Sequence, residues 1–163
     1  MTGERKKGLV VETIEFHGHP NILGTHYNTI EITRVDEISK RADCIIGVSA
    51  SKACSDLSPL LKRHIQAGGH LIFEIKVGAT SFAFTGKGRK ELQLTDPDEL
   101  VVRRSDFVSD RTAAVSCDAA ATDIPRKMIR LLQEKHTTGV LTISAADIPT
   151  QSDEIQFPLL IES

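Results

Sequence analysis

The alternation of hydrophobic and polar residues predicts short strands along most of the chain. Ile14 and Phe16 alternate with polar neighbours, and Ile30 and Ile32 do the same. A period of two is the pattern of a strand with one buried face. Similar patterns or short apolar runs predict further strands near residues 44–49, 71–77, 82–84, 92–94, 100–102, 113–117 and 140–144.

Two short helices are expected between these strands. Ser58-Pro59 is a typical N-cap and first-turn pair, and Gly68-Gly69 is a typical helix end. A second helix is predicted from about Pro125 to Lys135, after Asp123. Each helix precedes the last strand of its half of the chain.

The middle of the chain repeats itself at a long spacing. Four polar residues recur sixty-two positions later, where Thr33, Asp36, Glu37 and Arg41 are matched by Thr95, Asp98, Glu99 and Arg103. Five residues recur at a spacing of sixty-seven, where Val48, Ser49, Ala53, Asp56 and Leu57 are matched by Val115, Ser116, Ala120, Asp123 and Ile124. A long period that occurs only twice favours a duplicated domain over a solenoid.

We therefore predict a strand-dominated α+β fold. Its core is an antiparallel β-sandwich or a partly closed, jelly-roll-like barrel, made of two duplicated halves with one short helix each. Residues 10–148 form a single duplicated domain, with half one at 10–78 and half two at 79–148. Residues 1–9 are expected to be a flexible tail, and residues 149–163 a loosely held tail in which Phe157 to Ile161 is a candidate edge strand.

Composition narrows the classes of partner. The net charge is −2, and the chain has one Tyr, six Phe and no Trp, so nucleic-acid binding is disfavoured. No apolar run approaches the roughly 18 residues that span a bilayer, so no membrane association is expected. The three cysteines lack a C-x-x-C pair, which is typical of reduced thiols and predicts a cytoplasmic location.

The two halves differ in their polar loops. Residues 17–21 and 24–28 carry a histidine loop, whereas the second half is expected to have only the shorter segment 85–90 there. Conversely, residues 104–112 form a charged insertion where the first half has only residues 42–45. Loops that break the symmetry of a duplicated domain indicate a functional site, and drift of surface loops is the alternative.

The histidine loop supplies the candidate catalytic residues. A period of two continued back from Ile30 places Asn28 and His26 on the inward face, at the mouth of a pocket. His26 is then a candidate acid or base near neutral pH, with His19 as a second catalytic candidate and Asn21 and Asn28 as ligand-binding residues. The alternative is a histidine that is hydrogen-bonded to the loop backbone.

The charged loop supplies candidate binding residues for an anion. Arg103, Arg104 and Arg111 are the cationic side chains of this loop. Asp106 and Asp110 are expected to orient the arginines or to recruit Mg²⁺. The alternative is a self-neutralising surface loop of ion pairs.

Two further sites are weaker hypotheses. Lys52, before the first helix, is a candidate phosphate ligand, and a solvated surface lysine is its alternative. His17, His19 and His26 are candidate ligands of a divalent metal, although no carboxylate stands at a recognisable spacing for a fourth ligand.

Several motifs resemble a known family. They are Gly18-His19-Pro20-Asn21, Thr25-His26, and the segments 29–33, 43–48, 52–53, 104–107 and 111–112. On these residues the chain resembles the archaeal family catalogued as domain of unknown function 371. The resemblance implies a small archaeal cytosolic protein with a mostly β, sandwich-like or jelly-roll-like fold, and it implies no activity, substrate or cofactor.

The function predicted from the sequence is a small-molecule or phosphate-ester binding site, with catalysis as an open question. The site is formed by the histidine loop and the charged loop at residues 104–112, so these two loops must meet in the folded protein. One alternative is a non-enzymatic interaction or assembly module that oligomerises, with an exposed apolar patch near Phe107 or Phe157. The other alternative is a histidine-based metal-binding protein.

Overall fold

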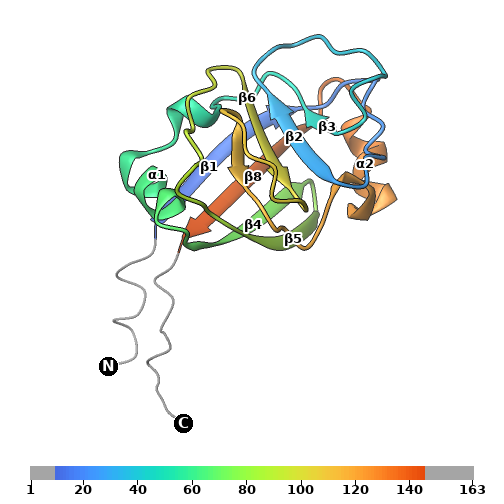
Figure 1. Ribbon diagram of the computed structural model, residues 1–163. Helices are drawn as coiled ribbons and strands as arrows, with labels where there is room; N and C mark the ends of the chain where they lie inside the picture. Colours follow the sequence, from blue (N-terminus) through green and yellow to red (C-terminus); the bar gives the residue numbers. More distant parts are fainter. Residues whose placement is uncertain (1–9, 146–163) are drawn as a thin grey trace, which may run out of the picture.

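The computed structural model describes residues 10–145 (Figure 1). The strands are β1 (Val10–His17), β2 (Thr29–Thr33), β3 (Ile45–Gly47), β4 (His70–Val77), β5 (Thr80–Lys87), β6 (Glu99–Arg103), β7 (Thr112–Ala114) and β8 (Thr138–Ala145). The helices are α1 (Pro59–Gln66) and α2 (Arg126–Leu132), and the 3₁₀ turns are η2 (Cys54–Asp56) and η3 (Ala121–Asp123). The strand-dominated α+β prediction is confirmed. The two predicted tails and the candidate strand 157–161 lie outside the described residues.

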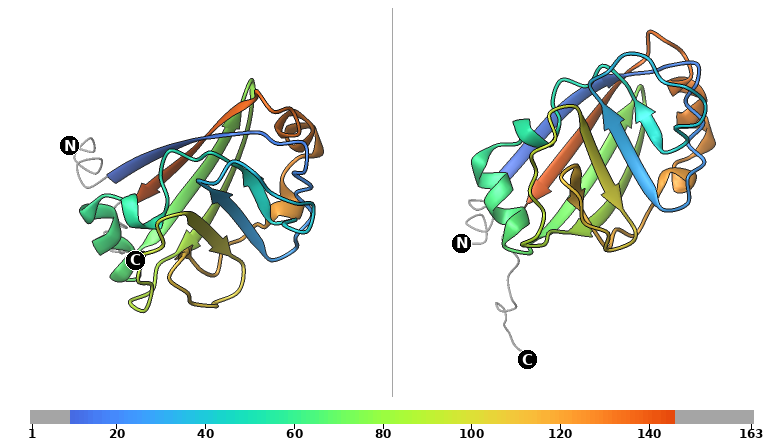
Figure 2. Two further views of the ribbon diagram at one scale, coloured as in Figure 1. Left: turned by 90° about the horizontal axis from the view of Figure 1, so that it is seen from above. Right: turned by 45° about the horizontal axis from the view of Figure 1, so that its top comes forward.

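The strands form two sheets that enclose one core. Their orders are β1-β8-β4-β5 and β3-β2-β6-β7, and α1 and α2 lie at opposite ends of the molecule (Figure 2). Ile32 and Val102 of one sheet belong to the same buried cluster as Phe73 and Ile75 of the other. At the edges of the two sheets, the described residues pair only through two isolated bridges, His17 with Val48 and Lys87 with Val115. Among these residues, no continuous ladder of hydrogen bonds therefore closes a barrel. Neither helix of the described part is long and apolar enough to cross a membrane.

The predicted all-antiparallel pairing is wrong for two pairs of strands. β3 runs parallel to β2, and β7 runs parallel to β6. The connections, residues 34–44 and 104–111, therefore bring the chain back to the end at which the preceding strand began. The prediction failed because a parallel pair ordinarily needs a crossover of a dozen or more residues, and both of these connections are shorter.

The strand predicted at residues 92–94 is also wrong. Leu92 and Leu94 are fully buried, but they belong to the loop before β6, and Leu94 has a φ of 58°. Their alternation arises because an irregular segment inserts two side chains into the core. Burial produced the period of two without a strand.

The order of elements occurs twice along the chain. Each half contains three strands, a 3₁₀ turn, a helix and a fourth strand. The matches at a spacing of sixty-seven occupy equivalent places: Ser49 and Ser116 both have a φ of 52°. Asp56 and Asp123 each accept a hydrogen bond from the amide three residues earlier, at 2.9 and 2.8 Å.

The matches at a spacing of sixty-two are not structurally equivalent. Thr33 ends β2, whereas Thr95 lies in the loop before β6. The element order instead aligns β2 with β6, so residues 18–28 and 88–98 are loops of equal length. The histidine loop is therefore distinct in residue type and not in length. The longer connection belongs to the first half, at residues 34–44.

Phe16 joins the edges of the two sheets. Its side chain is fully buried against Gly47 of β3 and Gly139 of β8. A Cβ atom at Gly47 would lie 2.2 Å from Phe16 Cδ1, and one at Gly139 would lie 2.4 Å from Phe16 Cζ. Interiors are close-packed, so both positions require glycine while the ring is present.

The packing of Phe16 predicts a coupled effect of two substitutions. Gly139→Ala is expected to lower the free energy of unfolding by about 1–3 kcal/mol through overpacking. Part of this loss should disappear when Phe16→Leu is combined with it, because the smaller side chain vacates the space of the methyl group. Urea denaturation of the single and double variants measures the coupling. Strict additivity would contradict the proposed contact.

Candidate functional site

The outer face of the sheet β3-β2-β6-β7 carries a polar cluster. Ile30 and Ile32 point into the core, so Glu31 between them lies on the opposite face. Such a position is normally solvated, but Glu31 is only 4% exposed. A carboxyl group buried on an outer face needs partners, because burying an unpaired charge is costly.

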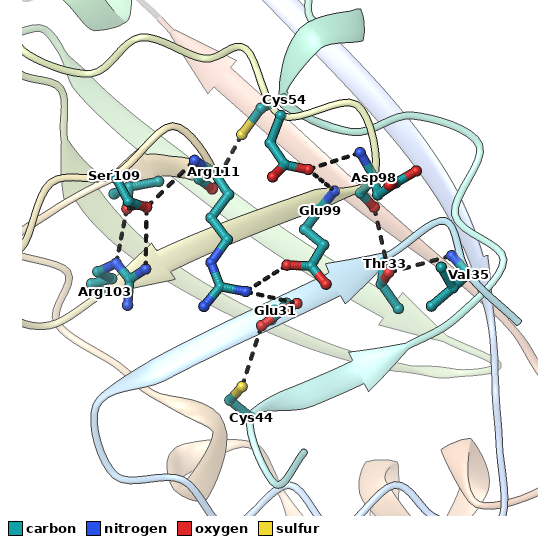
Figure 3. Close-up of polar contacts among 12 residues, drawn as sticks. Glu31, Thr33, Val35, Cys44, Cys54, Asp98, Glu99, Arg103, Ser109 and Arg111 are labelled. Carbon is teal, nitrogen blue, oxygen red and sulfur yellow. Dashed lines mark hydrogen bonds and ion pairs between the residues drawn. The ribbon is translucent and has the colours of Figure 1, made fainter. Parts of the chain in front are cut away.

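The sheet topology brings those partners to Glu31. Glu31 of β2 pairs directly with Val101 of β6, at the centre of the sheet. The Glu31 amide donates to the Cys44 carbonyl at 2.9 Å, and the Val101 amide donates to the Arg111 carbonyl at 2.8 Å. Cys44 precedes β3 and Arg111 precedes β7, so these residues approach the centre from its two sides (Figure 3).

One guanidinium group serves two carboxyl groups. Arg111 Nη1 lies 2.5 Å from Glu99 Oε1 and 3.7 Å from Glu31 Oε2. Cys44 Sγ donates to Glu31 Oε1 at 3.4 Å. The side chains of Arg111 and Glu99 are 40% and 28% exposed, whereas that of Glu31 is 5% exposed. The buried carboxyl group therefore lies behind a partly open ion pair.

This environment changes the proton affinity of Glu31. Burial raises the pKa of Glu31 to about 7, and the negative charge of Glu99 also raises it, against the opposing effect of Arg111. A carboxyl group with such a pKa can give or take a proton near neutral pH. Burial, followed by the charge of Glu31, raises the pKa of Cys44 to about 12. Cys44 is therefore a neutral donor and not a thiolate nucleophile.

Arg103 supplies a second cation on the same face. Its Nε donates to Thr112 Oγ1 at 2.8 Å, and its Nη2 donates to Ser109 Oγ at 3.4 Å. Its Cζ lies 4.9 Å from the centre of the Phe107 ring, and Phe107 is 60% exposed. Burial and the nearby charge of Arg111 lower the pKa of Arg103. Arg103 and Arg111 thus place two guanidinium groups beside the two carboxyl groups.

His26 stabilises the turn before β2. Its Nδ1 accepts hydrogen bonds from the amides of Asn28 at 3.1 Å and Thr29 at 3.2 Å. Asp96 Oδ1 accepts from the two corresponding amides of the second half, both at 2.8 Å. The expected inward-facing strand position is wrong, because β2 begins only at Thr29. The geometry matches the alternative of a histidine bonded to the loop backbone.

The two predicted loops meet through their backbones. The Arg104 amide donates to the Asn28 carbonyl at 2.8 Å. The side chain of Arg104 instead pairs with Asp123 at 2.9 Å. The Asp106 and Asp110 side chains are exposed, so their roles in orienting an arginine or binding Mg²⁺ stay predictions. Of the arginines in this loop, Arg103 and Arg111 are the two that reach the polar cluster.

His19 and Asn21 are bound to a different segment from His26. His19 Nδ1 accepts from the Asn21 amide at 3.0 Å, and His19 Nε2 lies 3.2 Å from Glu37 Oε1. Asn21 Nδ2 donates to the Ile38 carbonyl at 2.8 Å. These contacts attach the histidine loop to the β2–β3 connection.

Lys52 forms an ion pair, whereas the sequence predicted either a phosphate ligand or a solvated surface lysine at this position. Its Nζ contacts Glu12 Oε2, and Glu12 is buried. Glu12 Oε1 also accepts the Ser58 amide at 2.9 Å. The pKa of Glu12 is lowered: burial alone would raise it, but Lys52 and the Ser58 amide together outweigh burial. Lys52 therefore has a carboxylate partner near the start of α1.

The metal hypothesis gains no support from the described residues. Among residues 10–145, no group of three or more His, Cys, Asp or Glu side chains is arranged to hold a metal ion. The hypothesis that His17, His19 and His26 chelate a metal stays a prediction. All three cysteines are free, and Cys54 and Cys117 are buried.

Sequence reasoning missed Glu31, Glu99 and Cys44. The available signal was a carboxylate in the middle of a strand, between two core isoleucines. Alternation assigns such a residue to solvent. Its burial depends on Arg111, eighty positions away in the chain, and on a parallel strand that the pattern did not predict.

The fold and the cluster define a small two-sheet α+β protein with a carboxyl–guanidinium site on one sheet. The chain belongs to the family described as Domain of unknown function (DUF371), whose model matches residues 14–146. This confirms the resemblance seen in the sequence. The chain is 34% identical over 121 residues to a protein of Methanocaldococcus jannaschii named Uncharacterized protein MJ0206, covering 74% of this chain and 90% of that relative.

The turn contacts of His26 predict a stability effect. His26→Ala should lower the free energy of unfolding by about 1 kcal/mol, because two backbone donors lose their acceptor. His26→Asp should recover most of this loss, since Asp96 performs the same role in the second half. Thermal and urea denaturation of both variants measure the difference. An unchanged stability of His26→Ala would show that the turn does not need the imidazole.

The raised pKa of Glu31 predicts a slope of stability with pH. The folded protein binds the Glu31 proton more tightly than the unfolded chain does between pH 4.5 and about 7. The Glu31 proton therefore contributes fully to the free energy of unfolding below pH 4.5. This contribution, up to about 3 kcal/mol, is lost as the pH rises to 7. Glu31→Gln should flatten this part of the profile in urea denaturation at pH 5 and pH 8. Exposed Glu91→Gln is the control, and equal slopes in both variants would refute the assignment.

Proposed function

We propose that this protein binds a small anionic molecule on the outer face of the sheet β3-β2-β6-β7 and exchanges a proton with it. Arg103 and Arg111 bind the anionic group, and the carboxyl groups of Glu31 and Glu99 act on its proton. The observation that carries the proposal is the buried Glu31, with its pKa of about 7, behind a guanidinium group that is 40% exposed.

The chemistry follows from competition for Arg111. An arriving anion forms charge-assisted hydrogen bonds with the exposed part of this guanidinium group, in place of part of its contact with Glu99. Weakening the contact between Arg111 and Glu31 raises the proton affinity of Glu31 further, because Arg111 opposes the effect of burial. Binding an anion and taking up a proton are therefore coupled at this site.

The proposed site keeps part of the set predicted from the sequence. Arg111 binds the ligand as predicted, and His26 acts as a positioning residue through the turn before β2. The Asn28 carbonyl joins the two loops. The proposed roles of Arg104 and Lys52 are weakened by their ion pairs with other residues.

We also propose that residues 10–78 and 79–148 derive from one duplicated unit, in a cytoplasmic protein. The repeated element order and the matching roles of Asp56 and Asp123 support the duplication. The free cysteines accord with a reducing compartment.

A ligand screen tests the proposed function. The panel contains carboxylates, sugar phosphates, nucleoside monophosphates and divalent metal ions, and the readout is the melting temperature. A member at a hundred times its Kd should stabilise the protein by about 2.7 kcal/mol. Arg111→Gln and Arg103→Gln should remove this stabilisation.

Arg34→Gln is the matched control. Arg34 pairs with Asp56 at 2.9 Å, outside the polar cluster. The Arg34→Gln variant should therefore be stabilised by ligands as much as the unmodified protein is. Proton uptake on binding, measured by calorimetry in buffers of different ionisation enthalpy, should disappear in Glu31→Gln. A panel without any stabilising member, or proton uptake on binding that survives Glu31→Gln, would refute the proposal.

An interaction module is the second candidate function, favoured by one observation. Phe107 and Tyr27 are among the most exposed large hydrophobic side chains, at 60% and 78%. Exposed aromatic rings are common where proteins dock. The predicted patch at Phe157 lies outside the described residues.

A further inference from the structure

A groove of about 230 Å³ lies where β1, β3 and the turn after α2 meet. It shares no lining residue with the Glu31 cluster. Its lining is rich in imidazole and charged side chains, and consists of His17, Gly18, His19, Asp36, Val48, Ser49, Lys135 and His136. These residues come from four separate segments of the chain.

Gly18 allows this groove to form. A Cβ atom at Gly18 would lie 2.3 Å from the carbonyl oxygen of Glu134 and 2.4 Å from that of Leu132. The missing side chain lets the turn after α2 pack against the end of β1. The Gly18 amide donates to the Thr137 carbonyl at 2.9 Å, and the His17 amide donates to the Val48 carbonyl at 2.8 Å. The walls are therefore fixed by backbone hydrogen bonds.

The second half has the same close approach of a glycine to the end of a helix, at Gly88, with different side chains around it. A Cβ atom at Gly88 would lie 2.0 Å from the Ile65 carbonyl oxygen, and the Gly88 amide donates to Gly69 at 2.8 Å. The turn after α1 at this place is Ala67-Gly68-Gly69, without polar side chains. Lys87 and Arg89 stand there at the places of His17 and His19, so this backbone arrangement does not require the imidazoles of the groove.

The groove presents free donors for hydrogen bonds. Within residues 10–145, the side chains of His17, Lys135 and His136 make no hydrogen bond or ion pair. His19 is occupied on both ring nitrogens, by the Asn21 amide and by Glu37. A metal centre is disfavoured, because the described residues hold no group of three suitable ligands.

We propose that this groove binds a small phosphate-bearing anion through Lys135, His17 and His136, independently of the Glu31 site. Its volume of about 230 Å³ is below the roughly 300–1,000 Å³ of pockets for larger ligands. Lysine and protonated imidazoles donate charge-assisted hydrogen bonds to phosphate oxygens. Asp36 and Glu37 are the carboxylates at this groove, and they oppose the anion.

Titration followed by NMR of the imidazole groups tests this proposal. Inorganic phosphate at pH 6 should shift the ring signals of His17 and His136. The signals of His64 and His70, which lie outside the groove, should stay in place.

Two substitutions give opposite expected results. Lys135→Gln should weaken phosphate binding by roughly fivefold, whereas Asp36→Asn should strengthen it by removing an opposing charge. Arg111→Gln should leave it unchanged, which separates this site from the proposed function. Three results would overturn the proposal: unmoved His17 and His136 signals, no effect of Lys135→Gln, or Zn²⁺ binding that Asp36→Asn abolishes.

Discussion

The buried carboxyl group of Glu31 is the constraint on which the candidate site depends. An ionised carboxylate at this depth is costly unless a cation or a proton compensates its charge. The protein supplies both, through Arg111 and through a pKa raised to about 7. The arrangement requires β7 to run parallel to β6, because only then does the chain before β7 reach the centre of the sheet. The fold and the proton chemistry are therefore linked.

Much of the fold could be predicted from local patterns. Strands with one buried face, such as β1 and β4, follow from their alternation, and the predicted N-cap of α1 is confirmed by the Ser58 hydroxyl, which accepts a hydrogen bond from the Leu61 amide at 3.2 Å. The direction of β3 and β7 could not be predicted, because connections as short as theirs ordinarily join antiparallel strands. The segment containing Leu92 and Leu94 failed for a different reason, since a loop that buries side chains imitates a strand.

Less of the candidate site could be predicted, because its contacts are long-range. Arg111 was identified from its charge, but its partner Glu31 was assigned to solvent by its strand position. Lys52 and Glu12 are forty residues apart, and no spacing rule joins them. His26 was identified as a candidate acid or base, and its Nδ1 accepts hydrogen bonds from two backbone amides, which matches the structural alternative. Residue type indicated which loops carry polar groups, and the sheet topology determined which partners those groups contact.

The most direct test of this account is the titration of the Glu31 carboxyl carbon, followed by ¹³C NMR in the full chain with Glu31→Gln for assignment. The account predicts a midpoint near 7, in the range to which burial and Glu99 raise the pKa of Glu31. It also predicts that Glu99→Gln lowers this midpoint, because the neighbouring negative charge is removed. A midpoint of about 4.3, the ordinary value for glutamate, would contradict the central claim.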